Sequence, residues 1–243
     1  MPDEVGLLAT IVSAVGQGLT ATSLDQPCRD AVVTLSAGDA AVDGVAVTLS
    51  SQLGVRAVIG GSNENSRWLE HVQLSFGEGP CTEATTTRRP VIVHDLADPT
   101  ETRWPMVARM LAERPIRAVT AVPLTIGRSA VGSMNVHSEQ PHGLASLDLT
   151  SVMWIGQVLT IAVLALRARD PAETGAGLPD VIPQATGMVI AALRLGPADA
   201  LDRLRGVAFL QGRLLTDVAR DIVDGRMAPD LATAGPGAMA DSS

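Results

Sequence analysis

The apolar positions between residues 184 and 223 recur at three- and four-residue spacing, which is the period of an amphipathic helix. The central stretch is the clearest, because the Gly196-Pro197 pair suits the start of a helix and Gly212 suits its end. Its apolar stripe consists of Ala200, Leu201, Leu204, Val207 and Ala208. This spacing predicts one helix with a single buried face.

Two shorter apolar stretches flank this helix. The first runs from Met188 to Leu195 and has Gly196 as its natural stop. The second has Thr216 as a capping hydroxyl and Gly225 as its stop, and its inner face consists of Val218, Ala219, Ile222 and Val223. Helices this short are marginal alone, so each must bury its stripe against the others. The pattern therefore predicts a small all-α bundle of three helices.

The first two thirds of the chain contain stretches with the helical period and stretches in which apolar residues alternate, as in a strand. Residues 5–40 are predicted to be helical, with a stripe over Leu7–Val15 and a break at Asp25-Gln26-Pro27. From Gly44 the apolar period changes to two, which predicts a hairpin with a turn at Gln52-Leu53-Gly54. The later elements are predicted as strands at 90–95, 116–124 and 130–137, helices around 68–72 and 105–113, and a long apolar helix at 144–169. This order predicts an α+β fold, an antiparallel sheet with helices at its faces.

Two stretches have the composition of a connection and a tail. Residues 170–182 are rich in proline and glycine and are predicted to be a linker, in which Pro179, with Pro183 just beyond, should break or delay a helix. Residues 229–243 lack bulky apolar side chains and are predicted to be disordered. The predicted organisation is a sensory domain at 5–169, the linker, a bundle at 183–228 and the tail.

The charge of the chain limits its partners. The net charge is −8, and all 18 basic side chains are arginine. Residues 171–243 carry 9 acids and 6 arginines, which leaves −3 on the part that contains the bundle. This charge argues against a protein that is generally coated with nucleic acid, because phosphate binding needs positive charge. Any RNA contact must come from a local patch of arginines.

The longest uncharged segment, Leu149 to Leu166, has the length of a short membrane span. It contains the polar residues Thr150, Ser151 and Gln157, so we interpret it as a buried helix at a domain or subunit interface. The N-terminus lacks the positively charged region of a signal peptide. We therefore predict a cytoplasmic protein without membrane contact.

The candidate reactive side chains form no known catalytic or metal-binding pattern. The four histidines lack metal-ligand spacing, and no nucleophile elbow, Ser-x-x-Lys or phosphate-binding loop is present. Cys28 and Cys81 are expected to be buried thiols. Cys81 follows a proline at a predicted helix start, which leaves a redox switch as an alternative to plain packing. No metal, no cofactor and no enzymatic activity are predicted.

Three short patterns of the bundle resemble the ANTAR family. They are Ala185-x-Gly187-Met188, Ala200-x-x-x-Leu204-Arg205-x-x-Ala208 and Leu215-x-x-Val218-Ala219-x-x-Ile222. ANTAR domains are three-helix RNA-binding modules at the C-terminal end of bacterial antitermination regulators. The resemblance implies that the targets are paired RNA stem-loops overlapping a terminator, and that Ala185 and Gly187 belong to the RNA-binding region.

The arginines of the bundle are the candidates for RNA contact. They are Arg203, Arg205, Arg213 and Arg220. A guanidinium can grip phosphate with two hydrogen bonds and can stack on an unpaired base. Aspartates lie three or four residues from several of them, so a solvated face of salt bridges is the alternative.

The first two thirds of the chain resemble a GAF domain, of the type joined to ANTAR domains in actinobacterial regulators. The residues that carry this resemblance are Gly77-Glu78-Gly79-Pro80-Cys81, Arg89-Pro90-Val91, Asp95-Leu96, Arg103-Trp104-Pro105, Ala121-Val122-Pro123-Leu124 and Gly132-x-Met134-Asn135. The resemblance implies a ligand pocket lined by Cys81, His94, Asp95, Trp104 and Asn135. With only 2 Phe and 3 Trp in the chain, a small and partly apolar ligand, or none, is favoured over a purine or haem.

Two functions are compatible with these patterns. The first is a cytoplasmic regulator, dimeric through the helix at 144–169, in which the GAF domain receives a signal and the ANTAR bundle binds tandem RNA hairpins to prevent transcription termination. The alternative is a small-molecule or protein-interaction module whose degenerate ANTAR domain does not bind RNA. The negative charge of the C-terminal part and the two prolines of its linker region motivate the alternative.

Overall fold

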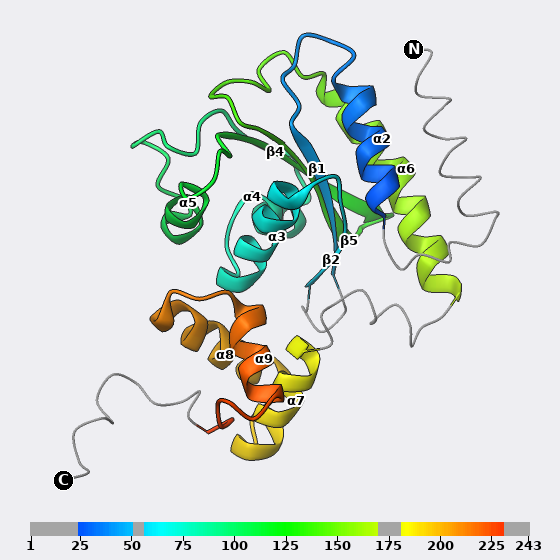
Figure 1. Cartoon of the computed structure of the whole chain (residues 1–243). Helices are drawn as coiled ribbons and strands as arrows, with labels where there is room; N and C mark the ends of the chain where they lie inside the picture. Colours follow the sequence, from blue (N-terminus) through cyan, green and yellow to red (C-terminus); the bar gives the residue numbers. More distant parts are fainter. Residues whose placement is uncertain (1–23, 51–55, 170–180, 231–243) are drawn as a thin grey trace. The chain divides into compact units, whose positions relative to one another are not determined.

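The computed structural model describes residues 24–50, 56–169 and 181–230. The chain divides into two compact units, residues 1–177 and 178–243, and each is described by itself (Figure 1). Several predictions fall outside the described residues. These are the helix over Leu7–Val15, the turn at Gln52–Gly54, the linker as far as residue 180 and the tail from residue 231.

The first unit is built on one antiparallel sheet. Its strands are β1 (Gly44–Ser50), β2 (Arg56–Gly61), β3 (Val91–Val93), β4 (Ala118–Ile126) and β5 (Ser129–Ser138). The strand order is β2-β1-β5-β4-β3, and all four neighbouring pairs are antiparallel. The predicted α+β architecture is confirmed, and β5 lies at the centre of the sheet.

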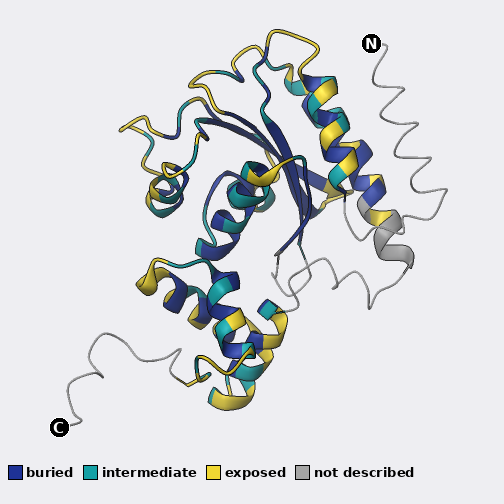
Figure 2. Cartoon of the chain, viewed as in Figure 1, coloured by how far each residue is buried: buried dark blue, intermediate teal, exposed yellow. Residues whose placement is uncertain are grey.

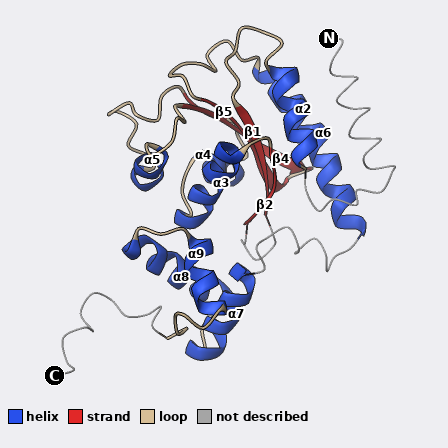
Figure 3. Ribbon diagram, viewed as in Figure 1, coloured by secondary structure: helices blue, strands red, loops and turns tan. Residues whose placement is uncertain are grey.

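Helices cover both faces of this sheet (Figures 1 and 3). One face carries α2 (Asp25–Leu35) and α6 (Leu149–Arg169); the other carries α3 (Glu64–Phe76) and α4 (Pro80–Thr87), and α5 (Pro105–Leu111) packs on α3. The strands are therefore buried on both sides, as the dark strands of Figure 2 show. Polar side chains on β5 that face α3 consequently lie inside the unit.

Two helix starts differ from the sequence prediction. The break predicted at Asp25-Gln26-Pro27 is wrong, because α2 begins at Asp25 and these residues form its first turn. The first turn of a helix has no intrahelical partners for its N–H groups, so proline is tolerated there. The long apolar helix begins at Leu149 instead of residue 144, because Asp148 accepts hydrogen bonds from the N–H groups of Thr150 and Ser151 at 3.1 and 3.0 Å. No helix among the described residues combines the length and apolarity that a membrane span needs.

The second unit consists, over residues 181–230, of α7 (Val181–Leu193), α8 (Pro197–Gln211) and α9 (Leu215–Val223). The stripe predicted on α8 is confirmed, since all five of its residues are buried. Pro197 opens α8, and Gly212 ends it in the left-handed conformation at φ 60°. The three-helix bundle predicted from spacing alone is therefore confirmed.

Four local details of this bundle differ from the prediction. Helix α7 begins at Val181, inside the range read as a linker, with Pro183 in its first turn. It ends at Leu193, before the expected stop, because Arg194 adopts a left-handed φ of 54°. Its buried residues are Ile182, Ala185, Thr186 and Val189, so Val189 alone of the predicted apolar run lies fully inside. The residue before α9 is Leu214, which makes the buried Thr216 part of the helix instead of its cap.

Candidate functional site

A layer of buried polar side chains lies between the central strand β5 and helix α3. Gly44 of β1 pairs with His137 of β5, and a Cβ added to Gly44 would meet both His137 and Ser66 of α3. His137 and the residues that alternate with it along β5 therefore face α3. We call this group the polar layer, and its members are Thr48, Ser66, Glu70, Gln73, Ser133, Asn135 and His137. Each of them is at most 2% exposed. Such burial requires hydrogen-bonding partners inside the protein or a bound molecule.

Hydrogen bonds tie the polar layer together across the sheet and the helix. The Asn135 amide donates to the carboxylate of Glu70. The Ser66 hydroxyl and His137 Nε2 lie 3.1 Å apart, and the hydroxyls of Thr48 and Ser133 lie 2.7 Å apart. These contacts fix the orientation of β5 side chains relative to α3.

Helix α4 joins the polar layer through its first turn. The Cys81 N–H donates to Gln73 Oε1 at 2.8 Å. This approach requires glycine at position 79, where φ is 120° and an added Cβ would lie 2.6 Å from Gln73 Oε1. The glycine-punctuated turn thus brings the buried start of α4 against α3.

In the polar layer, Gln73 Nε2, Asn135 Oδ1 and His137 Nδ1 are among the atoms that make no hydrogen bond within the described structure. Gln73 Nε2 is a donor and Asn135 Oδ1 an acceptor. A buried polar group without a partner costs about 1–3 kcal/mol. A small molecule that offers an acceptor and a donor to these atoms would recover that energy, so the polar layer is a candidate ligand site.

Burial also controls the ionisation of this region. Desolvation lowers the pKa of His137 to about 4, although the nearby Asp43 acts in the opposite direction. The imidazole is therefore neutral at physiological pH. Burial raises the pKa of Cys28 far above its ordinary value, with a further contribution from Asp25, so this thiol stays protonated and unreactive.

Positive and negative charges are equal in number in the described part of the second unit. Residues 181–230 contain 6 arginines and 6 aspartates, so their formal net charge is zero. Four of the arginines are ion-paired: Arg205 with Asp202 at 3.1 Å, Arg213 with Asp221 at 2.6 Å, Arg220 with Asp217 at 3.4 Å, and Arg226 with Asp221 at 2.7 Å and with Asp224 at 2.8 Å. Arg194 and Arg203 are exposed and make no ion pair within the described residues of this unit.

Family comparisons match both units. A model of the GAF domain matches residues 23–163, which is more than half of the chain. The chain belongs to the GAF domain family. A model of the ANTAR domain matches residues 179–223, which span α7, α8 and α9. The chain thus combines a signal-sensing GAF domain with an RNA-binding ANTAR domain, both of them regulatory domains.

Solved structures resemble the chain at low identity. The GAF domain of a phosphoenolpyruvate-protein phosphotransferase from Coxiella burnetii is 17% identical with a TM-score of 0.46, covering 69% of this chain and 96% of its own. The corresponding domain from Acinetobacter is 16% identical with a TM-score of 0.47, covering 68% and 95%. Free methionine-R-sulfoxide reductase from Neisseria meningitidis is 18% identical with a TM-score of 0.44, covering 69% and 92%. The comparison with curated proteins finds no match. These identities are too low to transfer an activity.

The GAF domain brings together only part of the predicted pocket. Asn135 belongs to the polar layer, and the buried Cys81 reaches it through Gln73. His94 is exposed and stacks on His142, with ring centroids 5.6 Å apart. The carboxylate of Asp95 accepts two hydrogen bonds from the Arg117 guanidinium, at 2.9 and 2.7 Å, which lower its pKa. His94 and Asp95 therefore lie outside the polar layer, because both follow the end of β3 and have surface partners.

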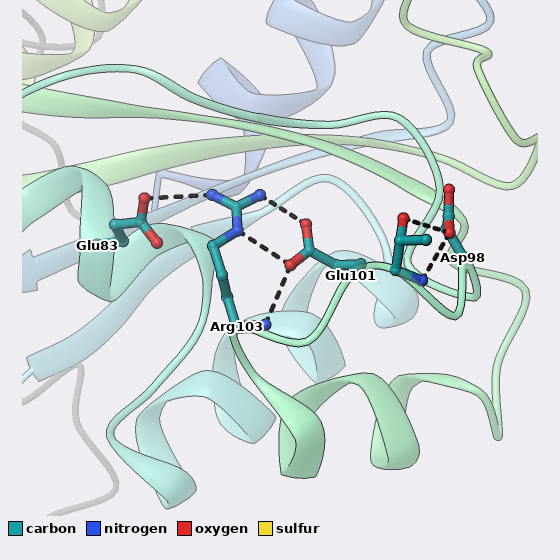
Figure 4. A network of polar contacts seen from close by, with 5 residues as sticks. Glu83, Asp98, Glu101 and Arg103 are labelled. Atoms are coloured by element: carbon teal, nitrogen blue, oxygen red, sulfur yellow. Dashed lines mark hydrogen bonds and ion pairs between the residues drawn. The ribbon is translucent and has the colours of Figure 1, made fainter.

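Trp104 is buried at the start of α5, and a network of charged residues holds the segment before it (Figure 4). The Arg103 guanidinium bridges Glu83 of α4 at 3.2 Å and Glu101 at 2.6 Å, and it lies 4.1 Å from the centre of the Trp104 ring. The hydrogen bond from Arg103 lowers the pKa of Glu101. This network positions Trp104 as a core anchor of the GAF domain.

Sequence reasoning missed most of the polar layer. The signal was present, since Ser133, Asn135 and His137 alternate with apolar residues along one strand. On α3, Ser66, Glu70 and Gln73 are spaced by four and three residues and so share one face. Polar residues on one face of a central strand would have indicated this site.

The structure places the residues predicted to bind RNA in different environments. Ala185 has no exposed surface, so its side chain packs inside the bundle. Arg205, Arg213 and Arg220 each have an aspartate partner, as the salt-bridge alternative proposed. Arg203 is the predicted arginine that the described residues leave without an ion pair.

Gly187 is exposed in the interior of α7, and a Cβ added there would meet no atom within 4 Å. We expect Gly187→Ala to raise the stability of the ANTAR domain by about 0.5–1 kcal/mol, because alanine loses less backbone entropy in a helix. Thermal unfolding followed by circular dichroism measures this change. A lower midpoint for the variant would contradict the open environment of this glycine.

Proposed function

We propose that the chain is a cytoplasmic, homodimeric regulator whose ANTAR domain binds tandem hairpins in nascent transcripts and prevents transcription termination. The observation that carries this proposal is the ANTAR match over three consecutive helices directly after a GAF domain. The proposal includes a sensory domain at 5–169, a linker that ends where α7 begins at Val181, an RNA-binding domain from α7 to residue 228, and a tail. We propose no catalytic activity for the chain.

The GAF domain is proposed to receive its signal at the polar layer. The donor Gln73 Nε2 and the acceptor Asn135 Oδ1 favour a small ligand that carries both an acceptor and a donor, such as an amide or a hydroxylated compound. The carboxylate of Glu70 lies in the same layer, where it accepts the hydrogen bond from Asn135. Ligand screens by thermal shift should therefore begin with small polar metabolites.

RNA binding by this domain must replace the aspartate partners of its arginines by phosphate groups. The bundle has no net charge, and phosphate groups would have to replace aspartates on Arg205, Arg213 and Arg220. Exposed ion pairs contribute only about 0–1 kcal/mol each, so breaking them costs little binding free energy. Arg203 can meet a phosphate without giving up a partner. We therefore expect RNA affinity to fall with salt, with a slope that reflects few phosphate contacts.

The second candidate function is a protein-interaction module whose ANTAR domain does not bind RNA. The zero net charge of residues 181–230 favours it, because RNA-binding surfaces are normally basic. Binding of the full chain to a panel of tandem-hairpin RNAs, at low and moderate salt, separates the two functions. Specific, salt-sensitive binding supports the regulator, whereas no binding to any hairpin supports the alternative.

Arg203→Ala tests the phosphate contact directly. We expect this variant to bind a hairpin about three to five times more weakly and to lower the slope of log affinity against log salt by about 1. The matched control is Arg128→Ala, which removes an exposed arginine from the β4–β5 turn of the GAF domain. Equal losses in the two variants would mean that the effect comes from general charge and not from the ANTAR surface.

A further inference from the structure

Three exposed arginines of the GAF domain lie together without an acidic partner. Arg88 and Arg89 follow helix α4, and Arg128 lies in the turn between β4 and β5. The Arg88 guanidinium donates to the Arg128 carbonyl oxygen at 3.0 Å, which joins two segments that are 40 positions apart. None of the three makes an ion pair within the described residues. We call Arg88, Arg89 and Arg128 the arginine cluster.

The arginine cluster is positive on a chain that is acidic as a whole. The net charge is −8, yet residues 84–94 and 114–138, which contain the cluster, include no aspartate or glutamate. The acidic residue of α4 is Glu83, and it is already paired with Arg103 at 3.2 Å. Guanidiniums that start from one small area repel each other, and an anion that binds among them relieves this repulsion. The cluster is therefore suited to a negatively charged partner.

Tight backbone geometry presents two of these arginines at the surface. Arg88 ends α4 in the left-handed conformation, at φ 57° and ψ 35°, where glycine is the usual residue. Arg128 follows Gly127, whose φ of 56° suits the two-residue turn that the pair of Ile126 and Ser129 closes. A residue other than glycine in the left-handed conformation costs backbone free energy, and such residues concentrate at binding sites.

We propose that the arginine cluster binds an acidic segment of a partner protein. A planar guanidinium matches a carboxylate with two parallel hydrogen bonds, and clusters of arginines recognise acidic peptide motifs in this way. Ile126 flanks the turn that carries Arg128 and is 41% exposed, so the same surface offers an aliphatic contact. The surface fits a peptide in which acidic residues flank an apolar one. This second binding surface does not depend on RNA binding by the ANTAR domain.

These observations favour a protein over RNA as the partner. Recognition of unpaired RNA uses aromatic rings on which bases stack, and neither the arginine cluster nor Ile126 provides one. Residues 24–169 contain 14 acids and 12 arginines, so an RNA strand that extends beyond the cluster meets an acidic surface. A short acidic segment stays within the cluster and avoids that repulsion.

The test measures binding of a short fluorescein-labelled peptide of glutamate, aspartate and leucine to the full chain by fluorescence anisotropy. We expect Arg89→Ala and Arg128→Ala each to weaken this binding about two- to fivefold, because each removes one exposed charge contact. The matched control is Arg109→Ala, which removes an exposed arginine of α5 that also has no ion pair within the described residues. This control should bind the peptide like the wild type, and higher salt should weaken the wild-type complex.

A second probe, single-stranded oligouridine, separates the two classes of partner. Tighter binding of oligouridine than of the acidic peptide, with a loss in Arg128→Ala, would assign the arginine cluster to RNA and overturn the inference. Equal losses for Arg109→Ala and Arg128→Ala, or no binding of the acidic peptide at low salt, would overturn it as well. A chain that binds the peptide at the cluster but binds no tandem hairpin would support this inference and remove the proposed function, so the two can fail separately.

Discussion

Replacing Leu204 by alanine is expected to unfold the ANTAR domain while the GAF domain stays folded. Leu204 has no exposed surface and lies at the middle of the stripe by which α8 packs in the bundle. Truncating a buried leucine to alanine costs about 2–5 kcal/mol, from lost burial and the cavity that remains. A bundle of some fifty residues has a total stability of only a few kcal/mol, so this loss is comparable with the whole.

The distribution of tryptophan allows the two domains to be followed separately. Trp68, Trp104 and Trp154 all lie in the GAF domain, and the ANTAR domain has none. Leu204→Ala should therefore lose helical circular dichroism at room temperature and keep the tryptophan fluorescence of the wild type. Leu210→Ala, which truncates an exposed leucine of the same helix, should change stability by no more than about 0.5 kcal/mol. A native circular dichroism spectrum for Leu204→Ala would mean that α8 does not hold the bundle.

Acidification is expected to destabilise the GAF domain through His137. The folded state lowers the pKa of this histidine from 6.5 to about 4, chiefly by burial. Unfolding therefore takes up a proton between these two pH values, and stability falls as pH decreases through that window. The loss amounts to about 1.4 kcal/mol between pH 7.5 and 5.5, and to about 3 kcal/mol once the pH is below 4.

Urea unfolding followed by tryptophan fluorescence measures this effect. The window from pH 7.5 to 5.5 avoids the carboxylates, since those with lowered pKa values, Asp95 and Asp148 among them, lose their contribution only in more acidic solution. His137→Asn is the matched variant, because it keeps a hydrogen-bonding group near Ser66 and removes the titration. The variant should lose at least 1 kcal/mol less than the wild type across the window. Parallel pH profiles would show that His137 is not the group responsible.

The bundle was predictable because its determinants are local. The α8 stripe depends on the helical period, and its ends depend on Pro197 and Gly212, which act within one turn. The same local reasoning failed at Pro27 and Pro183, which were taken to interrupt helices. Both residues lie in the first turn of a helix, where the missing N–H has no consequence. A proline in sequence marks a helix start as readily as a helix break.

The α+β class of the first domain and the three-helix bundle of the second could be predicted from the sequence, because periodicity and turn residues act over a few positions. What the functional side chains touch became visible only in the folded chain. Glu70 meets Asn135 across 65 positions and Ser66 meets His137 across 71, since the sheet brings distant segments together. The same packing placed His94 and Asp95 outside the polar layer and gave three of the four arginines predicted to bind RNA an aspartate partner. Contacts between segments depend on how a chain folds back on itself, and spacing along the sequence does not contain that information.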